Sequence, residues 1–124
     1  MYQVGDYLFN TKLAQIITPC GTTKDLTPIA FHLLTYLVEN NDRLINKREL
    51  ILKVWKHEVS DSSINKTISQ LRAIFKDCPQ APSYILTRRK LGYRLIAETK
   101  GLPAGVSIKG GKYTALNNAE VKLF

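Results

Sequence analysis

The first 26 residues alternate short apolar runs with turn signals. The runs are YQV, YLF, LAQII and TTKDL, and each boundary between them carries Gly, Asn, Asp or Pro. Short apolar runs bounded by such residues are typical of strands joined by tight turns. The pattern therefore predicts a meander of four short strands, a small sheet that needs another layer to pack on.

A helical period begins at Thr27-Pro28. Thr27 is a good N-cap, and Pro28 would stand at the first helical position, where its missing N–H costs nothing. Apolar residues then recur at helical spacing, which predicts a first helix over 28–40. Its apolar face comprises Ala30, Phe31, Leu34, Leu37 and Val38.

A second helix is predicted to begin after Asn46 and to end near 56–57. Asn46 and Glu49 have the spacing of a capping box, in which each side chain accepts from the other's backbone N–H. Ile45 and Leu50 fit the flanking hydrophobic staple. One face of this helix would carry Leu50, Ile51, Val54 and Trp55, and the tryptophan is expected to lie in the core.

A third helix is predicted over 62–76, with Asp61 as N-cap. Its narrow apolar stripe consists of Ile64, Ile68, Leu71 and Phe75. The face opposite this stripe is small, polar and cationic and holds no carboxylate. It consists of Ser62, Lys66, Ser69, Gln70 and Ala73, with Asn65, Arg72 and Lys76 on its flank.

Pro79 and Pro82 end this helix, and two β-rich runs follow, SYILT and GYRLIA. They predict a hairpin with the cations of RRKL at its tip. The order of elements is that of an α+β winged helix-turn-helix with an N-terminal four-stranded antiparallel sheet, three helices and a C-terminal hairpin wing. Residues 98–124 are expected to form a Gly-rich tail or linker, or a tail containing a small hairpin at 106–115.

Charge distribution points to an anionic partner. The net charge is +8, and residues 62–94 hold seven Lys or Arg against a single carboxylate. A solvated charged turn is the alternative for RRKL taken alone, because runs of charge are usually solvated faces.

Other classes of function find little support. Cys20 and Cys78 are far apart in the chain, and no His or Cys cluster has ligand spacing, so neither a zinc site nor a disulfide framework is expected and both thiols are predicted to be buried. The sequence has no Gly-rich phosphate loop, no nucleophile elbow and no paired carboxylates, so nothing in it favours an enzyme, and no cofactor is expected. No apolar run in this chain approaches the length of a membrane span, which favours a cytoplasmic location.

Three runs resemble the OmpR/PhoB-type DNA-binding domain in order and spacing, and the resemblance covers residues 2–97. They are LTPIAFHLLTYLVENNDRLINKRELILKVW, VSDSSINKTISQLRAIFKD and SYILTRRKLGYRLIA. The run ISQLR followed by KD is most similar to the ToxR/CadC branch. That branch implies the cytoplasmic part of an inner-membrane regulator, with a free-standing regulator as the alternative.

The resemblance implies a sequence-specific transcriptional regulator that binds double-stranded DNA. Helix 62–76 would enter the major groove, and wing 84–97 would lie over the adjacent minor groove and its phosphates. The helix positions that match the family's DNA contacts are Asn65, Lys66, Ser69, Gln70 and Arg72. Ser62, at the start of the helix, is added to them as a DNA-binding candidate. In the wing, Thr87 and Arg89 match, Arg88 and Lys90 add charge, and Tyr93 and Leu95 are expected to anchor the hairpin in the core.

Two departures from the family concern the wing and the helix. Many relatives carry a glycine at the position of Lys90, and many have more arginines on the helix than Ser69 and Gln70 supply. These departures bear on the turn geometry of the wing and on the preference for particular DNA sequences.

Arg72 is also open to a structural role, as an ion-pair partner of Asp61 or Glu58.

Several alternatives remain for function and partners. A winged helix can serve as a protein-interaction module without DNA specificity of its own. RNA binding is a third possibility, although the contact face lacks aromatic residues for base stacking. By resemblance, loop 56–61 is either a plain connector or a surface that touches RNA polymerase, and the family also implies a weak dimer on tandem half-sites.

Overall fold

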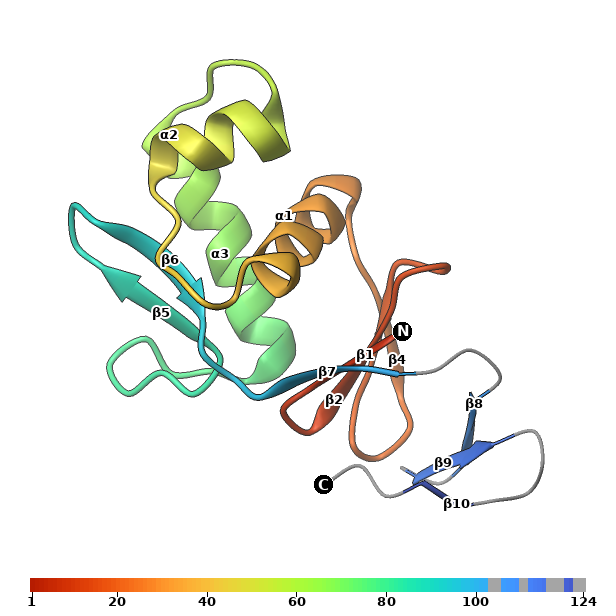
Figure 1. Cartoon of the computed structure of the whole chain (residues 1–124). Helices are drawn as coiled ribbons and strands as arrows, with labels where there is room; N and C mark the ends of the chain where they lie inside the picture. Colours follow the sequence, from red (N-terminus) through yellow and green to blue (C-terminus); the bar gives the residue numbers. More distant parts are fainter. Residues whose placement is uncertain (103–105, 110–111, 116–119, 122–124) are drawn as a thin grey trace. The chain divides into compact units, whose positions relative to one another are not determined.

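The computed structural model describes residues 1–102, 106–109, 112–115 and 120–121 (Figure 1). The chain divides into two compact units. One unit comprises residues 1–25 and 98–124, and the other comprises residues 26–97. Among the described residues, no helix is both long enough and apolar enough to span a bilayer.

The four predicted N-terminal strands are present. They are β1 (Tyr2–Val4), β2 (Tyr7–Asn10), β3 (Gln15–Ile17) and β4 (Thr23–Asp25), paired antiparallel in chain order. A fifth strand, β7 (Thr99–Gly101), pairs antiparallel with β1 on the open edge. Residues of β7 were predicted to lie in the tail, because Thr-Lys-Gly has no apolar alternation and the strand is held through its backbone.

Backbone hydrogen bonds fix this fifth strand at both ends. Gly5 N–H donates to Glu98 O at 2.8 Å, and Leu102 N–H donates to Met1 O at 2.9 Å. Further along the chain, β8 (Val106–Lys109) pairs antiparallel with β9 (Lys112–Ala115), which pairs with β10 (Glu120–Val121). The turn of the hairpin predicted at 106–115 lies outside the described residues.

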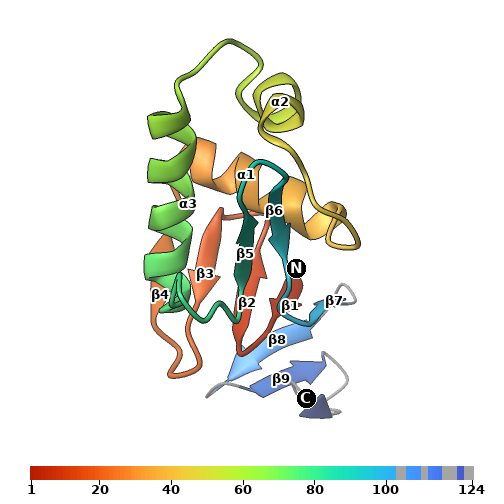
Figure 2. The same ribbon diagram turned by 90° about the vertical axis from the view of Figure 1, so that its left-hand side faces the viewer.

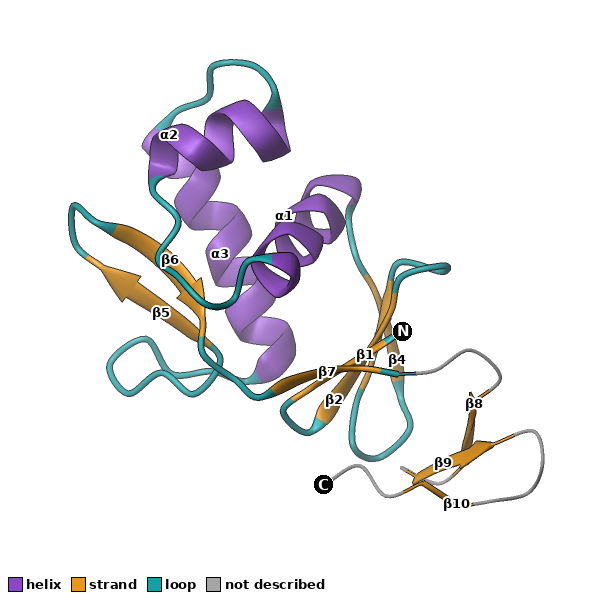
Figure 3. Cartoon of the chain, in the orientation of Figure 1, coloured by secondary structure: helices purple, strands orange, loops and turns teal. Residues whose placement is uncertain are grey.

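Residues 26–97 hold three helical segments and a hairpin (Figure 3). Helix α1 (Pro28–Glu39) begins as predicted, because the Thr27 side chain accepts from Ala30 N–H. The second helix is α2 (Lys47–Leu50), which continues as a π-helical turn, η1 (Ile51–Trp55). That wider turn closes where Lys56 N–H donates to Ile51 O at 2.7 Å.

Only half of the predicted capping box forms. Asn46 Oδ1 accepts from Glu49 N–H at 2.8 Å, but the Glu49 carboxylate accepts from Arg43 and from the Tyr36 hydroxyl instead of turning back to the cap. A guanidinium offers this carboxylate two charge-assisted hydrogen bonds, whereas the backbone of Asn46 offers a single N–H. Glu49 therefore links α1, the following loop and α2.

Helix α3 (Asp61–Phe75) starts one residue earlier than predicted. Its N-cap is Ser60, whose side chain accepts from Ser63 N–H, so the prediction of Asp61 as N-cap is wrong. Asp61 occupies the first turn, where a carboxylate favours the positive end of the helix dipole. The predicted apolar stripe is buried throughout: Ile64, Ile68, Leu71 and Phe75.

The wing consists of β5 (Ile85–Arg88) and β6 (Gly92–Leu95). Figure 2 shows this hairpin running beside α3. Tyr93 and Leu95 are buried, which confirms their role as anchors. Ile45 forms a bridge with Tyr93 through two backbone hydrogen bonds of 2.8 and 2.9 Å, and this bridge joins the wing to the segment before α2.

The fold is the predicted α+β winged helix-turn-helix, with two corrections to burial. Cys20 and Cys78 are exposed, so the prediction that both thiols are buried is wrong. Cys20 lies in the turn between β3 and β4 and Cys78 in the loop after α3, and both loops run over the surface. Trp55, expected in the core, is half-buried on the π-helical turn.

Candidate functional site

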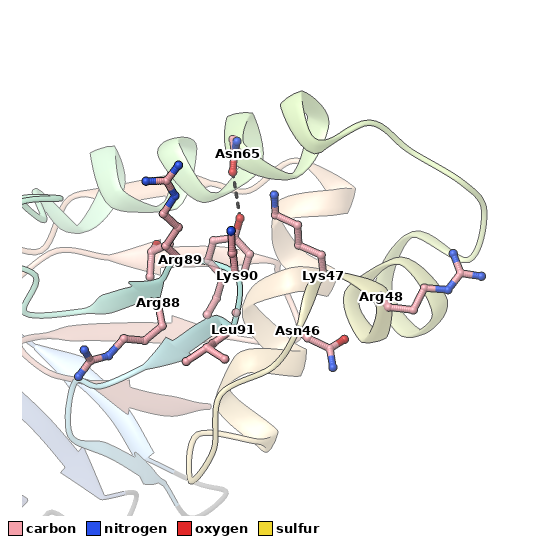
Figure 4. Close-up of a pocket in the computed structure, with 11 residues that line it drawn as sticks. Asn46, Lys47, Arg48, Asn65, Arg88, Arg89, Lys90 and Leu91 are labelled. Carbon is pink, nitrogen blue, oxygen red and sulfur yellow. Dashed lines mark hydrogen bonds between the residues drawn. The ribbon is translucent and has the colours of Figure 1, made fainter.

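A groove of about 560 Å³ lies between the turn of the wing, helix α3 and the start of α2 (Figure 4). Five of its lining residues are cations, and none is a carboxylate. The lining residues are Asn46, Lys47, Arg48, Asn65, Thr87, Arg88, Arg89, Lys90, Leu91, Gly92 and Tyr93. Lys and Arg side chains are donors only, so this surface suits a ligand that is rich in hydrogen-bond acceptors and negatively charged.

A tight turn presents the cations of the wing. Arg88 pairs with Gly92 across the hairpin, and Leu91 N–H donates to Arg88 O at 2.9 Å. Lys90 stands in this turn with φ of 65°, a left-handed conformation that glycine adopts more easily. In Figure 4, Arg89 and Lys90 rise towards α3, whereas Arg88 extends away from it. The turn therefore accommodates a lysine at a position where glycine is conformationally easier.

The start of α2 supplies groove residues that sequence reasoning missed. Asn46, Lys47 and Arg48 line the groove beside the wing, although they lie some forty positions earlier in the chain. Lys47 pairs with Asp61 at 3.1 Å, and Arg48 pairs with Glu58 at 2.5 Å. Asn46 and Glu49 did mark a helix start, but the bridge between Ile45 and Tyr93, which brings that start to the wing, carries no sequence signal.

The outward face of α3 lies largely outside this groove. Ser62, Lys66 and Ser69 are exposed, whereas Gln70 is half-buried. At about 100° per residue, Gln70 lies about 160° around the helix from Arg72, on the side turned away from the wing. Of the predicted helix residues, Asn65 alone lines the groove. The four predicted wing residues all line it: Thr87, Arg88, Arg89 and Lys90.

A hydrogen bond fixes Asn65 against the wing. The Tyr93 hydroxyl donates to Asn65 Oδ1 at 2.9 Å, drawn as the dashed line in Figure 4. Tyr93 is 3% exposed, and this burial, more than the charges around it, raises the pKa of its hydroxyl. The phenol therefore stays protonated and available as a donor. Because its oxygen faces Tyr93, the Asn65 amide group is held at the edge of α3 that meets the wing.

Arg72 is turned inwards, towards the wing. Its Nη2 donates to Ile85 O at 3.0 Å and to Thr87 Oγ1 at 2.6 Å. Its ion-pair partner is Asp77, with Nε 4.0 Å from Oδ2. The alternative partners predicted from the sequence, Asp61 and Glu58, pair instead with Lys47 and Arg48, so that prediction is wrong.

Comparison with known proteins identifies relatives of this chain. A family model described as "Transcriptional regulatory protein, C terminal" matches residues 21–95. The chain is 32% identical over 84 residues to the transcriptional regulatory protein AfsQ1 of Streptomyces coelicolor, covering 66% of this chain and 37% of that protein. It is 32% identical over 96 residues to the transcriptional activator CadC of Escherichia coli, covering 76% of this chain and 19% of that protein.

The DNA-binding domain of Escherichia coli CadC is also a structural neighbour. It superposes with a TM-score of 0.69 at 28% identity, over 80% of this chain and 94% of that domain. The curated relatives are much longer proteins, because the chain matches 37% of one and 19% of the other. The likeness therefore concerns one domain of those relatives.

Proposed function

The chain belongs to the OmpR/PhoB-type family of transcriptional regulatory proteins, and we propose that it binds double-stranded DNA sequence-specifically as part of a transcription regulator. The groove with five cations and no carboxylate among its lining residues carries this proposal. A duplex presents one phosphate charge per about 1.7 Å of its axis, and cations crowded on one surface gain more from that polyanion than their mutual repulsion costs.

Major-groove recognition is assigned to α3. A major groove about 12 Å wide admits one helix, which must bury one face and offer short polar side chains on the other. Helix α3 buries its apolar stripe and exposes Ser62, Lys66 and Ser69. Base reading is proposed for Asn65, Lys66 and Ser69, with Gln70 at the edge of the contact because it lies farthest from the wing.

Phosphate contact is assigned to the wing and the start of α2. Arg89 and Lys90 rise on the same side as α3, so a duplex seated on that helix meets them at the neighbouring minor groove (Figure 4). Lys47 and Arg48 add phosphate contacts on the opposite rim of the groove, where each is neutralised in the free protein by one exposed carboxylate. Exposed ion pairs are weak, so phosphates can replace those carboxylates at little cost.

The salt dependence of duplex binding tests this proposal. The preferred sequence is first selected from a random duplex library, and affinity for it and for random duplex is then titrated at several salt concentrations. Arg89→Gln is expected to weaken binding to both duplexes and to lower the salt slope by about 0.9, the effect of losing one phosphate contact. Lys66→Ala is expected to alter preference among sequences more than overall affinity.

Lys53→Gln is the matched control. Lys53 is an exposed cation of the same unit that lines a different groove, beside α1 and the π-helical turn. Its loss removes the same charge and should leave the salt slope unchanged. Absence of any salt-dependent affinity for duplex in the unmodified protein would refute the function. A partner protein competing with DNA for Lys66 and Arg89 would instead favour the protein-interaction module.

Further partners and boundaries stay predictions. Loop 56–61 is exposed except at Val59, which is compatible with a contact to RNA polymerase. His57→Ala should then reduce transcription from a bound promoter without weakening DNA binding. A weak dimer on tandem half-sites and a cytoplasmic location are likewise proposed on family resemblance.

A further inference from the structure

The guanidinium of Arg72 is committed to the interior of the protein. The side chain is 14% exposed, and its Nε is shut off from solvent without a hydrogen-bond partner among the described residues. The Nη2 group is shared between the backbone oxygen of Ile85, at 3.0 Å, and the hydroxyl of Thr87, at 2.6 Å. Little of this cation is left to face a ligand.

Asp77 holds Arg72 in that place. Its side chain is 1% exposed, and its carboxylate accepts from the backbone N–H groups of Ser83, Tyr84 and Ile85 at 2.7, 3.2 and 2.9 Å. The carboxylate is therefore fixed to the segment that leads into the wing and to its first residue. If Arg72 swung out to a phosphate, Asp77 would remain buried without its counter-ion, which is strongly unfavourable.

The hydrogen bond to Thr87 determines which way that hydroxyl acts. A threonine hydroxyl has one donor hydrogen and two acceptor lone pairs. The guanidinium has no acceptor, so in this pair Thr87 Oγ1 can only accept. Its own hydrogen must then point elsewhere, and Thr87 is exposed and lines the groove. A charged donor on the far side also makes this O–H a better donor.

We propose that Arg72 is a positioning residue that acts on DNA through Thr87: it fixes the Thr87 hydroxyl as a hydrogen-bond donor towards the phosphate backbone and does not touch the DNA itself. This inference rests on the proposed function. It replaces the direct contact that the family resemblance implies for Arg72. The bond between Arg72 and Thr87 also fixes the wing relative to the helix, because Arg72 belongs to α3 and Thr87 to β5.

A double-mutant cycle on duplex affinity separates an indirect role from a direct one. Thr87→Val removes the hydroxyl at nearly constant shape, and Thr87→Ser restores it. Thr87→Val is expected to weaken binding about tenfold, as expected for one lost hydrogen bond to a charged group, while Thr87→Ser stays within about twofold. Both variants are compared at equal folded fraction, measured by circular dichroism.

Arg72→Lys keeps the charge but loses the fork that reaches two acceptors. It is expected to weaken binding when Thr87 is present and to cause no further loss when combined with Thr87→Val. Equal losses in both backgrounds would show that Arg72 contacts the duplex by itself and would overturn the inference. If the unmodified protein bound no duplex, the proposed function would fail together with this inference, whereas additive losses refute this inference alone.

Guanidinium resonances of the unmodified protein give a second test that needs no variant to fold. In nuclear magnetic resonance spectra the Arg72 Nη signals should be visible in the free protein, because internal hydrogen bonds slow rotation and exchange. Addition of duplex should leave them in place while the Nε–H signal of Arg89 moves. Arg72 signals shifting as far as those of Arg89 would contradict a purely indirect role.

Discussion

Gly92 allows the wing to pack against the segment before α2, and Gly92→Ala should disrupt that packing. Its φ is 138°, which L side chains rarely adopt, and a Cβ at this position would stand 2.2 Å from Ile45 O and 2.9 Å from Asn46 N. Ordinary contact begins at 3.4 Å. The wing and the segment would have to part by roughly 1 Å, and both obstructing atoms belong to the backbone, which cannot rotate aside.

The energetic cost follows from the contacts that this movement breaks. The hydrogen bonds from Ile45 N–H to Tyr93 O, at 2.8 Å, and from Tyr93 N–H to Ile45 O, at 2.9 Å, would both be stretched or lost. Each contributes about 1 kcal/mol, and the unfavourable φ adds about 1–3 kcal/mol. We expect Gly92→Ala to lower the free energy of unfolding by about 3–5 kcal/mol, a large share of the 5–15 kcal/mol typical of a domain.

Urea denaturation measures this loss. Trp55 is the single tryptophan of the chain and belongs to the same unit as Gly92, so its fluorescence reports unfolding of residues 26–97. Gly21→Ala is the matched control, because Gly21 has φ of 90° but a methyl group added there would meet nothing within 4 Å. Gly21→Ala should lower the free energy of unfolding only through backbone strain, by about 1 kcal/mol. Circular dichroism measures this loss. Equal losses for the two variants would show that close packing of the wing on Ile45 contributes nothing.

Three further predictions concern separate parts of the chain. The Arg43 guanidinium, more than the Tyr36 hydroxyl, lowers the pKa of Glu49 to about 2. The ionised Glu49 therefore stabilises the fold fully above its unfolded pKa of about 4.3, and this stabilisation is lost as pH falls towards 2. Glu49→Gln should flatten the dependence of unfolding free energy on pH in that window. Lys90→Gly should relieve the strain of a lysine in the left-handed conformation and raise the free energy of unfolding by up to about 1 kcal/mol. It should also lower the salt slope of duplex binding. Unchanged DNA binding would argue against a contact between Lys90 and phosphate. Hydrogen bonds from neighbouring threonine hydroxyls lower the pKa of Cys20 to about 7. In the Cys78→Ser variant, where Cys20 is the remaining thiol, the rate of alkylation by iodoacetamide should rise with a midpoint near pH 7. A midpoint above about pH 8.5 would contradict this.

Local chemistry explains why the elements themselves could be predicted. Thr27 and Asn46 cap helices through side-chain oxygens that reach backbone N–H groups three residues away. The stripe from Ile64 to Phe75 is buried because a helix brings those positions onto one face. Such signals fail where competing groups lie close together, as at Ser60 and Asp61, either of which is a good N-cap.

The candidate site was predicted in part. The sequence indicated the charge of the wing and the polar face of the third helix, because both come from residues near one another in the chain. It did not indicate that Lys47 and Arg48 line the same groove, since a backbone bridge between Ile45 and Tyr93, distant in the chain, brings them to the wing. Whether Arg72 faces outwards or inwards also depended on Asp77 and Thr87, residues on other elements.

The sequence by itself determined the order of the first four strands, the helices and the wing, the N-caps of the first two helices, the buried stripe and the place where positive charge gathers, because each of these depends on groups within a few positions. Tertiary structure alone decided which cations share a groove, which partner neutralises Arg72, that Thr99–Gly101 extends the sheet beside β1, and why residue 92 must be glycine. Those outcomes depend on distances between segments far apart in the chain, and such distances are set by packing and by backbone hydrogen bonds that carry no side-chain signature.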